Sequence, residues 1–318
     1  AGESHHPDCG KKMNRTWHRF KASYLLFSFK QDKTAIFSLT VLLVLLVTGL
    51  LAPVFSPYDP YDPANIDIMN SELPPSWTED GEAAFLLGTD IQGRDLLSTM
   101  IYGLRLSILI GCGAVVLQGC LGVVVGLLAG YLGGKIDAVL MRIADIQLSF
   151  PYLMVAIFIS AIFQLAFGIG RYEDLAVPLL IVIIGLAEWP VYARTVRAAV
   201  MGEKNKEYVE AARVIGLNRW RIMFRHVLPN TMTSVLVIST IQVANAVMSE
   251  AALSFLGLGM PVTKPSQGSL IRSGFEYIFS GSWWITLFPG IFLVLLVLVI
   301  NLLGDWLRGV LNPKLYKG

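Results

Sequence analysis

A row of polar side chains within one apolar segment is the first place where this sequence could contact a hydrophilic solute. Between Val227 and Ser249 no residue is charged, yet hydroxyl and amide side chains recur every three or four residues, at Ser239, Gln242, Asn245 and Ser249, and Glu250 follows. This spacing places them on one face of a helix. Because unpaired polar groups are costly in hydrocarbon, the face should point inward. It then either lines a translocation pathway or forms hydrogen bonds with a neighbouring helix.

A single acidic residue interrupts another apolar segment. Glu188 is the one charge between Leu175 and Ala193. Inserting such a charge at the centre of a span costs roughly 3 kcal/mol, and less near the end of the span. We therefore interpret Glu188 as an interfacial residue paired with Arg194 or Arg197, with a gating role as the alternative.

Motifs that would let the chain hydrolyse ATP or hold a cofactor are missing from the sequence. Lysine follows glycine only at Gly10-Lys11 and Gly134-Lys135, and neither pair has the spacing of a phosphate-binding loop. The sequence also lacks zinc-ligand spacing, a nucleophile elbow and a dinucleotide fingerprint. We expect no catalytic residue, no metal site and no bound cofactor, so any energy for transport must come from another polypeptide.

The long polar loop 194–229 has the pattern of a helix-turn-helix. A first helix is predicted from about Lys204 to Ile215, where Gly216 stops it in the left-handed conformation. Asn218 is expected to cap a second helix that ends at Pro229. Four residues share one face of the first helix: Tyr208, Ala211, Ala212 and Ile215. Such a hairpin suits docking into a groove of a cytoplasmic partner, and a membrane-surface helix is the alternative.

Composition indicates the elements that position these residues. Of 318 residues, 54% are hydrophobic and 15% charged, with a mean hydropathy of +0.61, whereas soluble domains have about 25% charged residues. About 20 apolar residues form one membrane span. The sequence predicts an all-α polytopic membrane protein with six transmembrane helices, the one containing Glu188 being uncertain. The six stretches are 35–56, 106–134, 146–170, 175–193, 227–249 and 277–304.

The distribution of basic residues predicts the orientation of these spans. Of the 25 Lys and Arg residues, 20 lie on the side of the N-terminal tail, which positions both termini in the cytoplasm. The loop 57–103 carries nine acidic residues and one arginine and is expected outside. The expected organisation is a tail (1–35), a first span (36–56), a periplasmic loop (57–103), a core domain with five spans (104–306) and a cytoplasmic tail (307–318).

A stripe of small residues runs along the second predicted span. Gly122, Gly126 and Gly130 recur every four residues. In lipid, small residues let two helices approach closely, so we interpret the stripe as a helix-packing surface, with a hinge as the alternative.

The spacing within the polar loop carries a family resemblance. Glu210-Ala211-Ala212, followed by Gly216 and then by Leu228-Pro229, resembles the EAA loop of ABC importer permeases. Blocks at 87–95, 250–259 and 301–308 resemble the C-type permease of dipeptide and oligopeptide importers. The resemblance covers nearly the whole chain from Trp17. Two positions depart from the family pattern: His226, where an aliphatic residue is usual, and Gln267, where tryptophan is common.

The resemblance implies a type I ABC importer permease in the bacterial inner membrane. Its expected partners are a second related permease, two ATP-binding subunits that hold ATP and Mg²⁺, an extracytoplasmic substrate-binding protein and membrane lipid, with no nucleic acid. Residues implied to couple the chain to an ATPase are Tyr208, Glu210, Ala211, Ala212, Gly216, Leu228 and Pro229. Peptides are the favoured substrates, and nickel chelates or glutathione remain open. A secondary transporter is less favoured, because the predicted midplane is nearly free of acidic residues.

Overall fold

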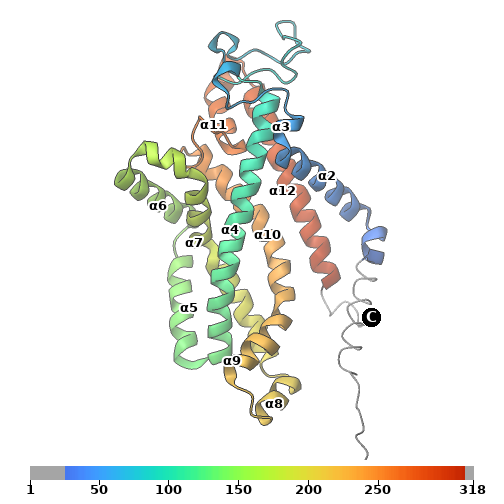
Figure 1. The fold of residues 1–318 in the computed structure, drawn as a ribbon, viewed down its shortest axis with the longest axis vertical. Coiled ribbons are helices and arrows are strands. Elements are labelled where there is room, and N and C mark those ends of the chain that lie inside the picture. Colours follow the sequence, from blue (N-terminus) through green and yellow to red (C-terminus); the bar gives the residue numbers. More distant parts are fainter. Residues whose placement is uncertain (1–25, 312–318) are drawn as a thin grey trace, which may run out of the picture.

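The computed structural model describes residues 26–311, which form a helical bundle without a β-strand in that range (Figure 1). The terminal parts of both predicted tails, including the ligand-type residues His5, His6, Asp8 and Cys9, lie outside the described residues. The helices are α2 (Lys33–Leu50), α3 (Ala52–Phe55), α4 (Leu96–Leu132), α5 (Gly134–Leu148), α6 (Tyr152–Phe167), α7 (Ile169–Glu203), α8 (Glu207–Val214), α9 (Arg219–Ile222), α10 (Leu228–Phe255), α11 (Gln267–Tyr277) and α12 (Trp284–Leu311), with short 3₁₀ turns at Pro63–Asn65, Ile68–Asn70 and Ile278–Ser280 and a π-turn at Met223–Val227.

Five helices in the described range are long and apolar enough to cross a membrane, and α5 with α6 makes a sixth span if the pair is counted as one. The all-α polytopic prediction is confirmed. The prediction of a single third helix over 146–170 is wrong, because α5 and α6 meet at a bend of 84°. Pro151 stands at this break and has no backbone N–H to continue the helix. The fourth predicted span, 175–193, which contains Glu188, lies within one unbroken helix, α7.

Several helices extend beyond the charge-free stretches. Helix α4 begins at Leu96 rather than at Leu106, α7 continues to Glu203, and the polar segment 135–145, predicted as a loop, belongs to α5. Scarcity of charge marks only the part of a helix that lies in hydrocarbon, so polar turns at its ends escape detection. The segment before α4 and helix α11 lie at one end of the bundle, and the α8–α9 hairpin lies at the other (Figure 1).

A buried ion pair secures the end of the bundle where α4 begins. Arg94 donates through Nε to Asp90 Oδ2 at 2.7 Å and through Nη1 to the Val262 carbonyl at 3.1 Å. Asp95 caps α4 by accepting from the Ser98 amide at 2.8 Å. Trp284 Nε1 on α12 donates to the Thr89 carbonyl. The sequence block 87–95 therefore joins the start of α4 to the connection before α11 and to α12.

The glycine stripe of α4 lies against α7. A Cβ atom built on Gly122 would stand 2.2 Å from Tyr192 Cβ, and one built on Gly126 would stand 2.5 Å from the Ala193 carbonyl oxygen. On Gly130 the nearest atom would be the Arg197 carbonyl oxygen at 2.9 Å. Only glycine allows this backbone approach, which favours the packing interpretation of the stripe over a hinge.

Candidate functional site

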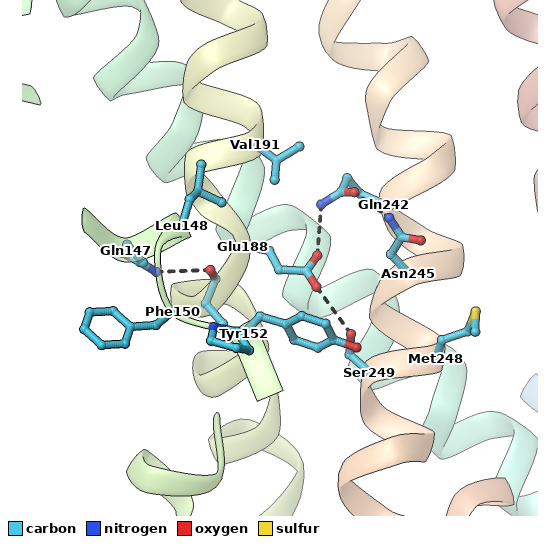
Figure 2. A pocket seen from close by; sticks show the side chains of 12 residues that line it. Gln147, Leu148, Phe150, Tyr152, Glu188, Val191, Gln242, Asn245, Met248 and Ser249 are labelled. Carbon is cyan, nitrogen blue, oxygen red and sulfur yellow. Dashed lines mark hydrogen bonds between the residues drawn. The ribbon is translucent and has the colours of Figure 1, made fainter. Parts of the chain in front are cut away.

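The polar face of α10 meets Glu188 in the interior of the bundle. Gln242 Nε2 donates to Glu188 Oε2 at 3.0 Å, and Ser249 Oγ donates to Glu188 Oε1 at 3.3 Å (Figure 2). All three side chains are buried. Glu188 extends from α7 toward α10, so the acidic residue and the polar row form one cluster.

The predicted pairing of Glu188 with Arg194 or Arg197 is wrong. Arg194 pairs with Asp145 at 2.5 Å, and Arg197 pairs with Asp137 through two bonds of 2.5 and 2.7 Å. Both aspartates lie on α5, within the segment 135–145 for which the sequence predicts a loop. The Glu188 carboxylate accepts instead from the neutral donors Gln242 and Ser249.

A cavity of about 520 Å³ opens beside Glu188, between the α5–α6 break, α7 and α10. Three residues of the predicted polar row, Gln242, Asn245 and Ser249, line it. The remaining lining residues are Gln147, Leu148, Phe150, Pro151, Tyr152, Ala187, Glu188, Val191 and Met248.

The two ends of the polar row lie outside the cavity. Ser239 accepts a hydrogen bond from the Tyr192 hydroxyl at 2.9 Å. Glu250 is fully buried and accepts from Ser107 and Ser254 at 2.7 Å each. The structure thus brings Gln242, Asn245 and Ser249 together at the cavity, whereas Ser239 and Glu250 form interhelical or local hydrogen bonds. The interpretation as an interhelical hydrogen-bond seam is supported for Ser239, Gln242 and Ser249, which all bind α7. The translocation pathway remains a prediction for the residues at the cavity.

Two glutamines are not among the predicted site residues: Gln147, which lines the cavity, and Gln118, which binds the lining residue Gln242. Gln147 binds the Ala187 carbonyl at 3.1 Å and accepts from Trp189 Nε1 at 2.9 Å, which fixes the end of α5 against α7. Gln118, buried on α4, accepts from Gln242 Nε2 at 3.3 Å. An amide side chain inside a charge-free stretch was the available signal for both.

At the opposite end from α11, α8 and α9 form the predicted hairpin. Gly216 adopts φ +82° just beyond Ile215, the C-cap of α8. The Asn218 side chain caps α9 by accepting from the Trp220 amide at 3.1 Å. Both local predictions are confirmed. The first helix is shorter than predicted, Glu207–Val214, and Leu228 and Pro229 begin α10 rather than ending the hairpin.

Tyr208 connects the hairpin to the two long helices beside it. Its hydroxyl donates to Glu203 Oε2 at 2.7 Å and accepts from Asn230 Nδ2 at 3.2 Å. Burial, followed by the bond to the Glu203 carboxylate, raises the pKa of Tyr208 to about 12. The hydroxyl therefore remains a proton donor at neutral pH and holds α8 between the end of α7 and the start of α10.

One face of α8 packs inward and another is exposed. Val209 and Ala212 are buried, whereas Tyr208, Glu210 and Ala211 are exposed. The set predicted to share one face is therefore divided, because Ala212 packs inward. At the tip, Val214 is 88% exposed and Ile215 is 77% exposed. Beyond the turn, the rings of Trp220 and Phe224 stack at 6.3 Å and are also exposed.

We expect Gly216→Ala to destabilise the folded chain by about 1 kcal/mol, because a Cβ is strained at positive φ even where space is free. Gly202→Ala is the matched control, since Gly202 also has nothing within 4 Å of an added Cβ but lies inside α7. Its substitution should be neutral or stabilising by about 0.5–1 kcal/mol. Thermal denaturation of the purified complex measures both, and equal shifts would contradict the backbone argument.

Comparison with known proteins gives consistent matches over most of the chain. The family described as "Binding-protein-dependent transport system inner membrane component" matches residues 122–317, and "N-terminal TM domain of oligopeptide transport permease C" matches residues 13–75. The chain is 41% identical to the di/tripeptide transport system permease protein DppC of Pseudomonas aeruginosa (strain UCBPP-PA14), covering 91% of this chain and 90% of that protein. It is 39% identical to the dipeptide transport system permease protein DppC of Escherichia coli (strain K12), covering 90% and 91%.

A solved structure supports the fold. An inward-facing conformation of the MetNI methionine ABC transporter contains a chain that superposes with a TM-score of 0.54 at 21% identity, covering 68% of this chain and 96% of that one. At this identity the likeness concerns the architecture alone.

Proposed function

The chain belongs to the family of binding-protein-dependent transport system inner membrane components, and we propose that it is the C-type permease subunit of a peptide-importing ABC transporter. The observation that carries the proposal is the combination of two features on one chain. A polar cavity with a buried carboxylate lies inside the bundle, and a helical hairpin with exposed apolar residues projects at one end.

The proposed role of the hairpin is to couple the bundle to an ATP-binding subunit. Its exposed side chains Tyr208, Glu210 and Ala211, with Val214 and Ile215 at the tip, would contact that subunit, while Gly216 and the start of α10 set the angle of the hairpin. ATP and Mg²⁺ would be bound by the ATPase, and this chain would contribute no catalytic residue. Closure of two ATPases would move α8 and, through Tyr208, the adjoining ends of α7 and α10.

We further propose a heterodimer in which this chain supplies half of the translocation pathway and a related permease the other half. An extracytoplasmic binding protein would dock at the end formed by the segment before α4 and by α11. The asymmetry of basic residues supports an inner-membrane orientation with both termini in the cytoplasm.

The similarity to di/tripeptide and dipeptide permeases favours a di- or tripeptide substrate over a nickel chelate or glutathione. To test this, the complex is assembled with its permease, ATPase and binding-protein partners in proteoliposomes, and uptake of a labelled dipeptide is followed. We expect uptake only when ATP is present on the side of the membrane that carries the ATPases and the binding protein is also present. Uptake driven by a proton or sodium gradient without ATP would contradict the proposal.

A further inference from the structure

Glu188 is the only charged side chain among the residues that line the cavity. The other lining residues are apolar or carry neutral amide and hydroxyl groups, and none is Lys, Arg or His. The carboxylate is 9% exposed, and no ion pair found within residues 26–311 includes it. Within the described part of the chain, the cavity therefore has an acidic group without a cationic partner.

The hydrogen bonds of Glu188 leave acceptor capacity on both oxygens. Oε2 accepts from Gln242 and Oε1 accepts from Ser249, and both donors are neutral. A carboxylate has roughly four acceptor sites, so further donors can bind. Gln242 is in turn fixed by Gln118 and Asn245, which holds the carboxylate in place. A buried carboxylate is costly unless a cation compensates it.

The remaining walls suit a small organic cation. The rings of Phe150 and Tyr152 lie at the α5–α6 break, and Met248 contributes an adaptable apolar surface from α10 (Figure 2). Aromatic faces also attract cations. The volume of about 520 Å³ is within the ~300–1,000 Å³ typical of small-molecule sites.

We propose that Glu188 is the contact in the pathway for the amino-terminal ammonium group of a peptide in transit. This inference rests on the proposed peptide-import function and adds a recognition site to it. An ammonium group supplies three N–H donors and a positive charge, which match the free acceptor sites of a carboxylate between Gln242 and Ser249. The peptide side chains would then lie against the rings and Met248.

A charge-selective chemical probe tests the site without transport. The assembled complex carries Met248→Cys, with Cys9, Cys112 and Cys120 replaced by alanine, and is treated with two methanethiosulfonates of similar size, one bearing a trimethylammonium group and one a sulfonate. The measured quantity is the rate of modification by the cationic reagent divided by the rate by the anionic one. We expect this ratio to be roughly tenfold higher at position 248 than for a free thiol, because of the nearby carboxylate. Adding Glu188→Gln should abolish this preference, whereas the control Asp145→Asn should retain it. A ratio that Glu188→Gln leaves unchanged would overturn the inference.

Transport then separates this inference from the proposed function. With saturating peptide-loaded binding protein, Glu188→Gln should lower the dipeptide uptake per ATP hydrolysed, Glu188→Asp should restore part of it, and Asp145→Asn should equal wild type. Wild-type uptake with no deficit in Glu188→Gln would overturn the Glu188 assignment alone, whereas absence of ATP-dependent uptake by wild type would overturn the proposed function. If Glu188→Gln is not recovered as folded complex, the Glu188→Asp variant provides the test. A ratio of uptake to ATP hydrolysis equal to that of wild type in Glu188→Asp would then overturn the assignment.

Discussion

Gly122→Leu is expected to prevent stable packing of α4 against α7 and to remove most of the folded chain from the membrane. Even a Cβ at this position would stand 2.2 Å from Tyr192 Cβ and 2.8 Å from the Trp189 carbonyl oxygen. The nearest atoms belong to a helical backbone and to the first side-chain carbon, which cannot rotate away. The helices must separate, and we expect a loss of more than about 3 kcal/mol, the upper end of overpacking costs.

Gly290→Leu provides the matched control for this substitution. Gly290 also lies within an apolar helix, α12, but an added Cβ there meets nothing within 4 Å. Size-exclusion profiles and thermal denaturation of the detergent-solubilised chain compare the two variants. A Gly122→Leu protein as stable as Gly290→Leu would show that α4 and α7 do not pack as described.

Much of the fold could be predicted because hydrocarbon imposes a simple condition on the sequence. Stretches without charge mark α2, α4, α10 and α12, and a stretch with the single charge Glu188 marks α7. The scarcity of charge there reflects the cost of burying it. The same condition is silent about the helical turns outside the hydrocarbon. The charge pattern therefore does not indicate that 134–148 is helical, or that a sharp bend near Pro151 separates this helix from the next.

The candidate site was only partly predictable for a related reason. The polar row on α10 follows from spacing within one helix, and the turn at Gly216 follows from the conformational freedom of glycine. The partners of Glu188, in contrast, lie 54 and 61 residues further along the chain. Sequence proximity favoured Arg194 and Arg197, but these bind aspartates of α5. Contacts between distant helices depend on packing that a local pattern does not encode.

Ile215→Asp is expected to detach the ATP-binding subunit while leaving the permease folded. Ile215 is 77% exposed at the tip of the α8 hairpin, beside Val214, which is 88% exposed, so its side chain contributes little to the stability of this chain. In the proposed complex that side chain is buried against the ATPase. An aspartate there would bury an unpaired carboxylate in an apolar contact, and a loss of about 2 kcal/mol or more, typical of a central interface residue, lowers affinity more than about tenfold.

Ile68→Asp is a closely matched control. Ile68 is also 77% exposed, but it lies in the segment before α4, at the opposite end of the bundle from the hairpin. The substitution changes the same residue type to the same charge. It should therefore reproduce any general effect on expression or solubility without affecting the ATPase contact.

The most direct test of the coupling assignment is the amount of ATP-binding subunit that co-purifies with this chain from membranes, measured by quantitative mass spectrometry. Our account predicts wild-type recovery of the ATPase with Ile68→Asp and loss of most of it with Ile215→Asp, at equal amounts of folded permease. Undiminished recovery of the ATPase with Ile215→Asp would contradict the assignment of the α8 hairpin as its docking site.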